Sequence, residues 1–121
     1  MKHFVLSATL LLSTSVLAKE AYRGCPAKQD THGLSSISFY DGDPSGDAQL
    51  APDNTDEGNA RTLHYVFDQK NAETQGVYQV CEYRASTKKI VTKLPVDIRR
   101  CEVTLIGKGA QAHASRVACH K

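Results

Sequence analysis

The chain has 121 residues, with 15 Lys or Arg against 13 Asp or Glu and a formal net charge of +2. A charge balance this close to neutral argues against proteins that bind nucleic acid or anionic membrane surfaces. No stretch of basic residues with interleaved aromatic residues occurs, which supports the same exclusion.

The first 18 residues have the parts of a secretory signal peptide: a short basic start, an apolar run at 4–12, and small residues before Ala18. The apolar run is too short to cross a bilayer, which takes about 20 residues. We therefore expect a signal peptide at 1–18, release into the periplasm without membrane insertion, and one disulfide-stabilised β-rich domain at 19–121.

All four cysteines follow this leader: Cys25, Cys81, Cys101 and Cys119. An even number of cysteines in an exported chain predicts two disulfides and an oxidising compartment. Three pairings are possible, and we favour Cys81–Cys101 within the sheet and Cys25–Cys119 between the chain ends. A lipid anchor on Cys25 is disfavoured, because Arg23 occupies a position where such anchors require a small residue.

Strands are predicted wherever apolar and polar residues alternate. A first strand is expected within 34–40 and a second within 61–67, with a turn or single helical turn at 68–76. The segment 77–105 holds three strand-like runs, the first two forming a hairpin around 86–89 that leads into a third strand. A weak last strand, 112–119, follows a glycine-containing loop. We predict an α+β fold of mostly antiparallel sheet with little helix, or an all-β fold as the alternative.

The segment 41–58 is polar and rich in Asp, Gly and Pro, so it predicts a long loop. Its start, Asp41 to Gly46, matches the beginning of a calcium-binding loop, with oxygen ligands at positions one, three and five. The acidic ligand that closes such a loop at position twelve is replaced by Pro52. An Asx-turn is the ordinary alternative, and we predict no metal and no cofactor.

Catalytic motifs are absent from the sequence: it contains neither Gly-x-Ser-x-Gly nor His-Glu-x-x-His. The clustered acids of the polar loop have no apolar pocket nearby of the kind that tunes a glycosidase acid. We therefore predict a binding protein rather than an enzyme. Tyr and Arg are the residues that most often anchor interfaces, and the exposed candidates include Tyr40, Tyr83, Arg84, Lys88 and Lys89. The two lysines also suit a hairpin tip kept soluble and protected from edge pairing.

Short motifs along nearly the whole expected domain resemble a known family: Cys25-Pro26, Ser38 to Pro44, Leu50 to Asp53, Cys81 to Tyr83, Thr87, Leu94-Pro95 and Cys101. The chain resembles small periplasmic immunity proteins of Gram-negative type VI secretion systems. More narrowly, it is similar to the Vibrio-type immunity proteins that neutralise a lysozyme-like, peptidoglycan-cleaving effector. Those proteins tend to carry a tryptophan after the acidic loop, whereas this chain has none.

The resemblance implies an immunity protein that binds a secreted peptidoglycan hydrolase and blocks its substrate cleft, and it also implies a homodimer. Two protrusions could enter the cleft. One is the polar loop with Tyr40, Asp41, Asp43 and Asp47, and the other is the hairpin tip with Tyr83, Arg84, Lys88 and Lys89. Charge complementarity to an acidic cleft favours the basic tip. The alternatives are a periplasmic ligand- or protein-binding module without a toxin partner, and a small hydrolase.

Overall fold

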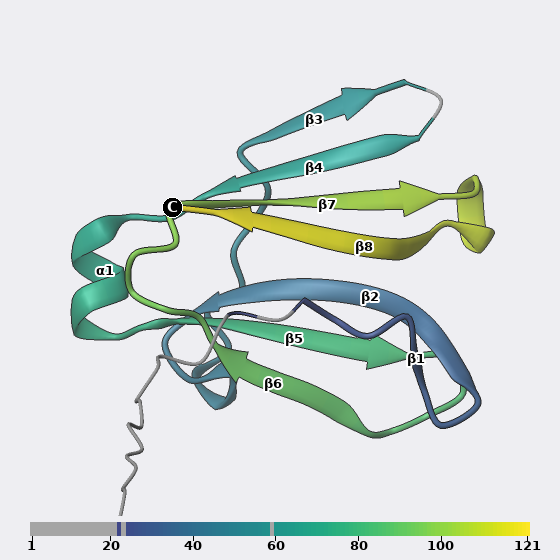
Figure 1. Cartoon of the computed structure of the whole chain (residues 1–121), viewed down its shortest axis with the longest axis horizontal. Helices are drawn as coiled ribbons and strands as arrows, with labels where there is room; N and C mark the ends of the chain where they lie inside the picture. The colour runs from purple at the N-terminus through teal and green to yellow at the C-terminus, as the bar shows by residue number, and fades with distance from the viewer. Residues whose placement is uncertain (1–21, 23, 59) are drawn as a thin grey trace, which may run out of the picture.

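The computed structural model describes residue 22 and residues 24–58 and 60–121, so the predicted leader lies outside the described residues. In this part of the chain, eight strands form two four-stranded sheets in which every pairing is antiparallel (Figure 1). Little of the described chain is helical, and the single α-helix has six residues. The predicted fold class, mostly antiparallel sheet with little helix, is confirmed, and the all-β alternative fits as well.

The first sheet has the strand order β1-β2-β5-β6. Its strands are β1 (Lys28–Gln29), β2 (His32–Asp41), β5 (Val77–Tyr83) and β6 (Lys89–Lys93). Strands β5 and β6 pair directly, which confirms the hairpin predicted around 86–89. In β2 the pairing with β5 skips Ser35, and this β-bulge lets Leu34 and Ile37 both face the core although they are three residues apart.

The second sheet has the strand order β3-β4-β7-β8. Its strands are β3 (Asn54–Glu57), β4 (Arg61–Val66), β7 (Arg100–Ile106) and β8 (His113–His120). A third strand, β7, follows the β5–β6 hairpin as predicted, but the expectation that it lies in the same sheet was wrong, because β7 pairs with β4 and β8. The connection after β6 crosses from one sheet to the other, with Leu94 and Ile98 buried in the core along the way.

Two connections contain more structure than the sequence indicated. The predicted loop at 41–58 holds a 3-10 turn, η1 (Pro44–Gly46), and the whole of β3, whose four residues are all exposed and therefore show no apolar alternation. The predicted helical turn is α1 (Gln69–Thr74), which begins where the Asp68 carboxylate accepts hydrogen bonds from two backbone N–H groups. It ends at Thr74, and the chain turns away at Gly76, whose φ of +84° suits glycine because that residue lacks a Cβ.

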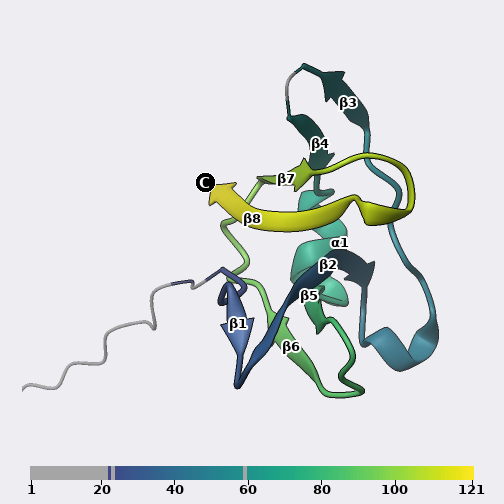
Figure 2. The same cartoon turned by 90° about the vertical axis from the view of Figure 1, so that its right-hand side faces the viewer.

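A single cluster of buried side chains joins the two sheets, which touch along β2 and β8. At its centre the Phe39 ring is completely buried. Its centroid lies 4.7 Å from that of Tyr65 and 5.3 Å from that of Phe67. Figures 1 and 2 show the sheets side by side, with α1 at the end of the molecule where β2 and β4 finish. Because Phe39 belongs to one sheet and Tyr65 to the other, these tilted aromatic contacts fix how the sheets meet.

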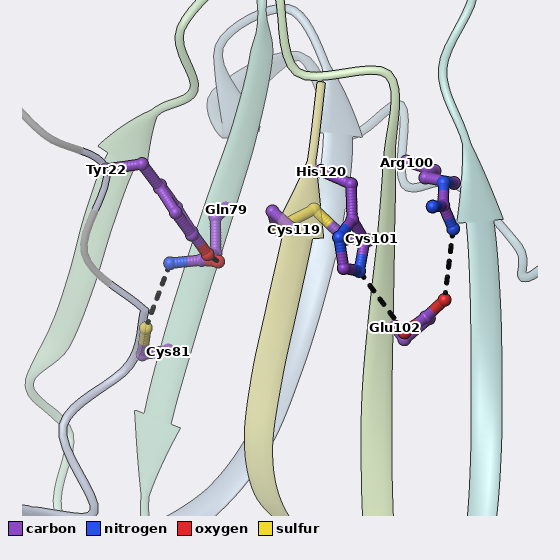
Figure 3. Close-up of a disulfide and its surroundings, with 8 residues drawn as sticks. All are labelled: Tyr22, Gln79, Cys81, Arg100, Cys101, Glu102, Cys119 and His120. Atoms are coloured by element: carbon purple, nitrogen blue, oxygen red, sulfur yellow. Dashed lines mark hydrogen bonds and ion pairs between the residues drawn. A yellow bond between two sulfur atoms is a disulfide. The ribbon is translucent and has the colours of Figure 1, made fainter.

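The disulfides join Cys25 to Cys81 and Cys101 to Cys119, so the favoured pairing was wrong. That pairing assumed that β5 and β7 lie in one sheet. Instead, Cys101 on β7 lies directly opposite Cys119 on β8, with their Cα atoms 4.0 Å apart (Figure 3). Cys81 on β5 bonds the segment before β1. One disulfide therefore staples the second sheet, and the other ties the N-terminal segment to the first.

Candidate functional site

The two predicted protrusions lie at opposite ends of the first sheet. Strands β2 and β5 run antiparallel with Tyr40 opposite Tyr78 and Leu34 opposite Tyr83. The polar loop after β2 and the hairpin tip after β5 are therefore separated by nearly the full length of a strand, as Figure 1 shows. A single loop of a partner protein could not contact both protrusions at once. We therefore treat the candidate residues as two separate groups.

In the polar loop, the side chains of Asp43 and Asp53 accept backbone hydrogen bonds that hold the loop in place. The Asp43 carboxylate accepts a hydrogen bond from the Ser45 backbone N–H at 2.9 Å, and hydrogen bonds from Ser45 lower the pKa of Asp43. This is the Asx-turn considered from the sequence. Asp47 is the left-handed residue that ends η1, and its N–H donates to the Pro44 carbonyl. Asp53 accepts a hydrogen bond from the Val66 N–H at 2.7 Å.

At the other end, Tyr83 is not an exposed candidate, because its side chain is buried in the core. Its hydroxyl donates a hydrogen bond to the Pro26 carbonyl at 2.9 Å, and burial raises the pKa of Tyr83. Tyr83 therefore anchors the base of the hairpin tip against the N-terminal segment. Cys81, which lies two residues earlier on the same face of β5, is buried as well.

Arg84, Lys88 and Lys89 are exposed around the tip of the β5–β6 hairpin. The Lys89 ammonium lies 3.8 Å from the Glu82 carboxylate, so part of its charge is balanced. Arg84 and Lys88 form no ion pair within the part of the chain that the structure describes. The tip thus presents positive charge to solvent.

Next to this tip lie two adjoining hollows of about 610 and 410 Å³ between the sheets. Arg84 and His113 line both, so we treat them as one groove and call it the inter-sheet groove. Ser35 on β2 and Gln111 of η2 (Gly109–Gln111) line one part, and Lys28 and Ser115 line the other. Figure 2 views the molecule from this end.

Sequence reasoning found Arg84 but missed the rest of the inter-sheet groove. Its residues come from β1, β2, η2 and β8, and only the crossing of the chain between sheets brings them together. His113 stands at the start of the weak last strand, where its ring Nδ1 lies 3.1 Å from the Gln111 carbonyl. No motif in the sequence signals this neighbourhood.

A row of charged side chains crosses the second sheet. Glu102 on β7 is the centre, with His120 Nε2 3.4 Å and Arg100 Nη1 3.3 Å from its carboxylate oxygens (Figure 3). His64 on β4 is half-buried, and its ring Nε2 lies 2.9 Å from the Asp56 carboxylate. Partial burial would raise the pKa of Glu102, but the hydrogen bond from His120 and the nearby positive charges outweigh it and lower that pKa. The row ties neighbouring strands together.

Beside the Cys25–Cys81 disulfide lies a buried polar contact. The Tyr22 hydroxyl donates a hydrogen bond to the side chain of Gln79, which is completely buried on β5 (Figure 3). Burial raises the pKa of Tyr22 to about 12. Together with the disulfide, this contact holds the N-terminal segment against the first sheet. We see in it a structural role rather than a reactive one.

Metal-binding geometry is not found in the described residues, where no three or more His, Cys, Asp or Glu side chains are placed to hold an ion. Nor does any helix in residues 24–58 or 60–121 have the length and apolar character needed to span a membrane. What the arrangement offers chemically is a positively charged tip beside a groove rich in hydrogen-bond donors, which suits recognition of another molecule.

Comparison with known proteins relates the chain to a family. The family model described as the type VI secretion system Tli immunity protein matches residues 27–120, which covers all the strands and both 3-10 turns. Searches among curated proteins and among solved structures found no match. A match over this much of the chain is decisive for the family, and it agrees with the resemblance drawn from the short motifs. This chain belongs to the Tli immunity protein family of the type VI secretion system.

Proposed function

We propose that this protein acts in the periplasm, where it binds a lysozyme-like, peptidoglycan-degrading effector and blocks its substrate cleft with the tip of the β5–β6 hairpin. Membership of an immunity family carries the first part, because such a protein protects by binding its effector. Two disulfides support the compartment, since disulfides persist in oxidising surroundings. The leader predicted at 1–18 would deliver the protein there.

The charge distribution supports the tip as the inhibitory element. A lysozyme-like cleft carries catalytic carboxylates, and the exposed Arg84 and Lys88 would complement them. The acidic residues of the polar loop would be repelled by such a cleft, and two of them, Asp43 and Asp53, already accept backbone hydrogen bonds. Complementary charge speeds association and selects the partner, so the basic tip is the better plug.

The test is a titration of the exported, oxidised protein, purified from the periplasm, into the effector encoded beside its gene. Calorimetry gives the stoichiometry, while peptidoglycan lysis and phospholipid release are measured in parallel, because the envelope offers both as substrates. We expect one-to-one binding with a dissociation constant of about 1 nM and wall lysis that stops at equivalence. Phospholipid release without wall lysis would refute the lysozyme-like effector but leave the immunity role intact.

Paired variants then locate the plug. Lys88→Glu reverses a charge at the hairpin tip, whereas Asp47→Asn removes one from the polar loop at the opposite end. We expect the first to slow association and weaken inhibition and the second to leave both unchanged, because only the tip faces the cleft. If the opposite pattern were found, the polar loop would be the inhibitory element.

We also propose a homodimer formed through β6, an edge strand of the first sheet, where Val91 is exposed. Antiparallel pairing centred on Val91 would place Lys89 of one copy opposite Lys93 of the other. Screening by salt reduces such repulsion, so the dimer should strengthen as ionic strength rises. Light scattering after gel filtration measures this, and a monomer at every protein and salt concentration would exclude the dimer.

A further inference from the structure

Two β-bulges shape the inter-sheet groove, and they face it from different sheets. In β2 the extra residue is Ser35, and in β8 it is Ser115, which is skipped between Ala114 and Arg116 in the pairing with β7. Each of these serines lines the groove. Bulges redirect side chains and are frequent beside functional sites. These bulges lie on β2 and β8, the two strands along which the sheets meet. We conclude that the groove is a specific feature of the fold rather than a chance gap between the sheets.

The groove has an apolar floor and a polar, donor-rich wall. Leu34 and Ala114 form the floor and are 4% and 1% exposed. The wall carries the Arg84 guanidinium, the Ser35 hydroxyl and the Gln111 amide, whereas the Ser115 hydroxyl donates to the Thr104 carbonyl at 3.2 Å. None of the residues that line the groove is acidic. A site with cationic and neutral donors and no carboxylate of its own is suited to an anion.

Backbone contacts fix Arg84 in a position where its side chain lines this groove. Its backbone N–H donates to the Gly33 carbonyl at 2.9 Å, which fixes the residue at the exit from β5. The next residue, Ala85, has a φ of +55°, an uncommon conformation for a residue with a Cβ, and it turns the chain sharply away. The guanidinium has no ion pair with any residue that the structure describes, so its donors are available to a ligand.

We propose that the inter-sheet groove receives the carboxylate of an Asp or Glu side chain from a protruding loop of the effector. This inference rests on the proposed function and deepens it. The hairpin tip is convex and the groove beside it is concave, and Arg84 belongs to both. A partner whose cleft takes the tip therefore brings the rim of that cleft over the groove. Arg84 binds the carboxylate in the two-pronged manner that its planar guanidinium permits, and the floor packs against the carbon atoms of the same side chain.

A peptide probe tests the groove without the effector. Blocked hexaglutamate is titrated into the exported, oxidised protein, with blocked hexaglutamine as the control, and amide resonances are followed by NMR. We expect shifts at Ser35, His113 and Ser115 with hexaglutamate only. Arg84→Ala should weaken this binding about tenfold, as expected for the loss of a charged hydrogen bond. Equal shifts with both peptides, or an unchanged affinity in Arg84→Ala, would overturn the proposal.

A second variant occupies the groove while leaving Arg84 in place. Ala110 is exposed on η2 at the lip of the groove, so Ala110→Trp fills the space without disturbing the core. Ala60→Trp, at the exposed turn before β4, is the matched control. We expect Ala110→Trp to weaken effector binding about tenfold or more, whereas Ala60→Trp should not affect it.

The outcomes separate this inference from the proposed function. If Lys88→Glu abolishes inhibition while Ala110→Trp and Arg84→Ala bind the effector normally, the plug stands and the groove as a docking site is refuted. If the parent protein binds hexaglutamate through Arg84 but does not bind the effector, the groove is a carboxylate-binding site. The proposed function, and the effector as the source of the bound carboxylate, would then both be refuted. Loss of effector binding in both groove variants, with normal binding by Ala60→Trp, supports the whole proposal.

Discussion

Removing the Cys25–Cys81 disulfide should destabilise the protein more than removing Cys101–Cys119. The first links residues separated by 56 positions and the second by 18. In the chain-entropy model, loops of these lengths correspond to about 4 and about 3 kcal/mol of stabilisation. Either loss is large against the roughly 5–15 kcal/mol that holds a typical domain folded. The two bonds are otherwise well matched, because each joins a completely buried cysteine to a half-buried one.

The comparison uses two double variants, Cys25→Ala with Cys81→Ala and Cys101→Ala with Cys119→Ala, measured by urea denaturation at pH 7. Each variant loses one buried and one half-buried sulfur, so the packing losses are similar in the two variants. We therefore expect their free energies of unfolding to differ by about 1 kcal/mol, which reflects the different loop lengths. Mapping of unreduced peptides checks the connectivity directly. A greater loss in the Cys101–Cys119 variant would refute the loop argument, and a Cys81–Cys101 peptide would refute the pairing itself.

Three further changes test other contacts. Replacing Glu102 by Gln should flatten the pH dependence of stability. The lowered pKa means that this carboxylate stabilises the fold above its ordinary value of 4.5 and that the stabilisation is lost as the pH falls through the folded value, which acid titration of unfolding measures. Tyr83→Phe removes the hydrogen bond to Pro26 and should cost about 1 kcal/mol in urea denaturation. Gly107→Ala should lower the melting temperature, because φ is +92° and the new Cβ would lie 2.8 Å from the Gln111 carbonyl oxygen; an unchanged melting temperature would show that this turn relaxes freely.

Apolar alternation was enough to locate most strands, because a strand with one buried face repeats every two residues. It located β4 and the β5–β6 hairpin, where Tyr65 and Cys81 are buried, and Phe67 just after β4 is buried too. It failed for β3, whose residues are all exposed. That strand is held by pairing with β4 alone, so its own sequence carries no signal of burial.

The predicted disulfide pairing was wrong because the correct pairing depends on how the sheets pack, which the local sequence does not show. Neighbouring strands usually pair, and this made Cys81 and Cys101 look like partners. Whether the connection at 95–99 returns along the same sheet or crosses to the other depends on how the whole core packs. The inter-sheet groove was missed for the same reason, since Ser35 and Ser115 meet there only after the sheets have joined.

The contrast between the two ends of the first sheet bears on how an immunity protein can bind its effector. At one end, Asp43 accepts a hydrogen bond from the Ser45 N–H within the loop and Asp53 accepts one from the Val66 N–H of β4, and stripping these carboxylates away for a partner would leave both N–H groups unpaired. At the other end, Arg84 and Lys88 have no ion pairs to break within the described chain. Binding there costs less reorganisation, so the energy of new contacts appears more fully as affinity. This asymmetry favours the hairpin tip and the adjoining groove as the effector-facing surface.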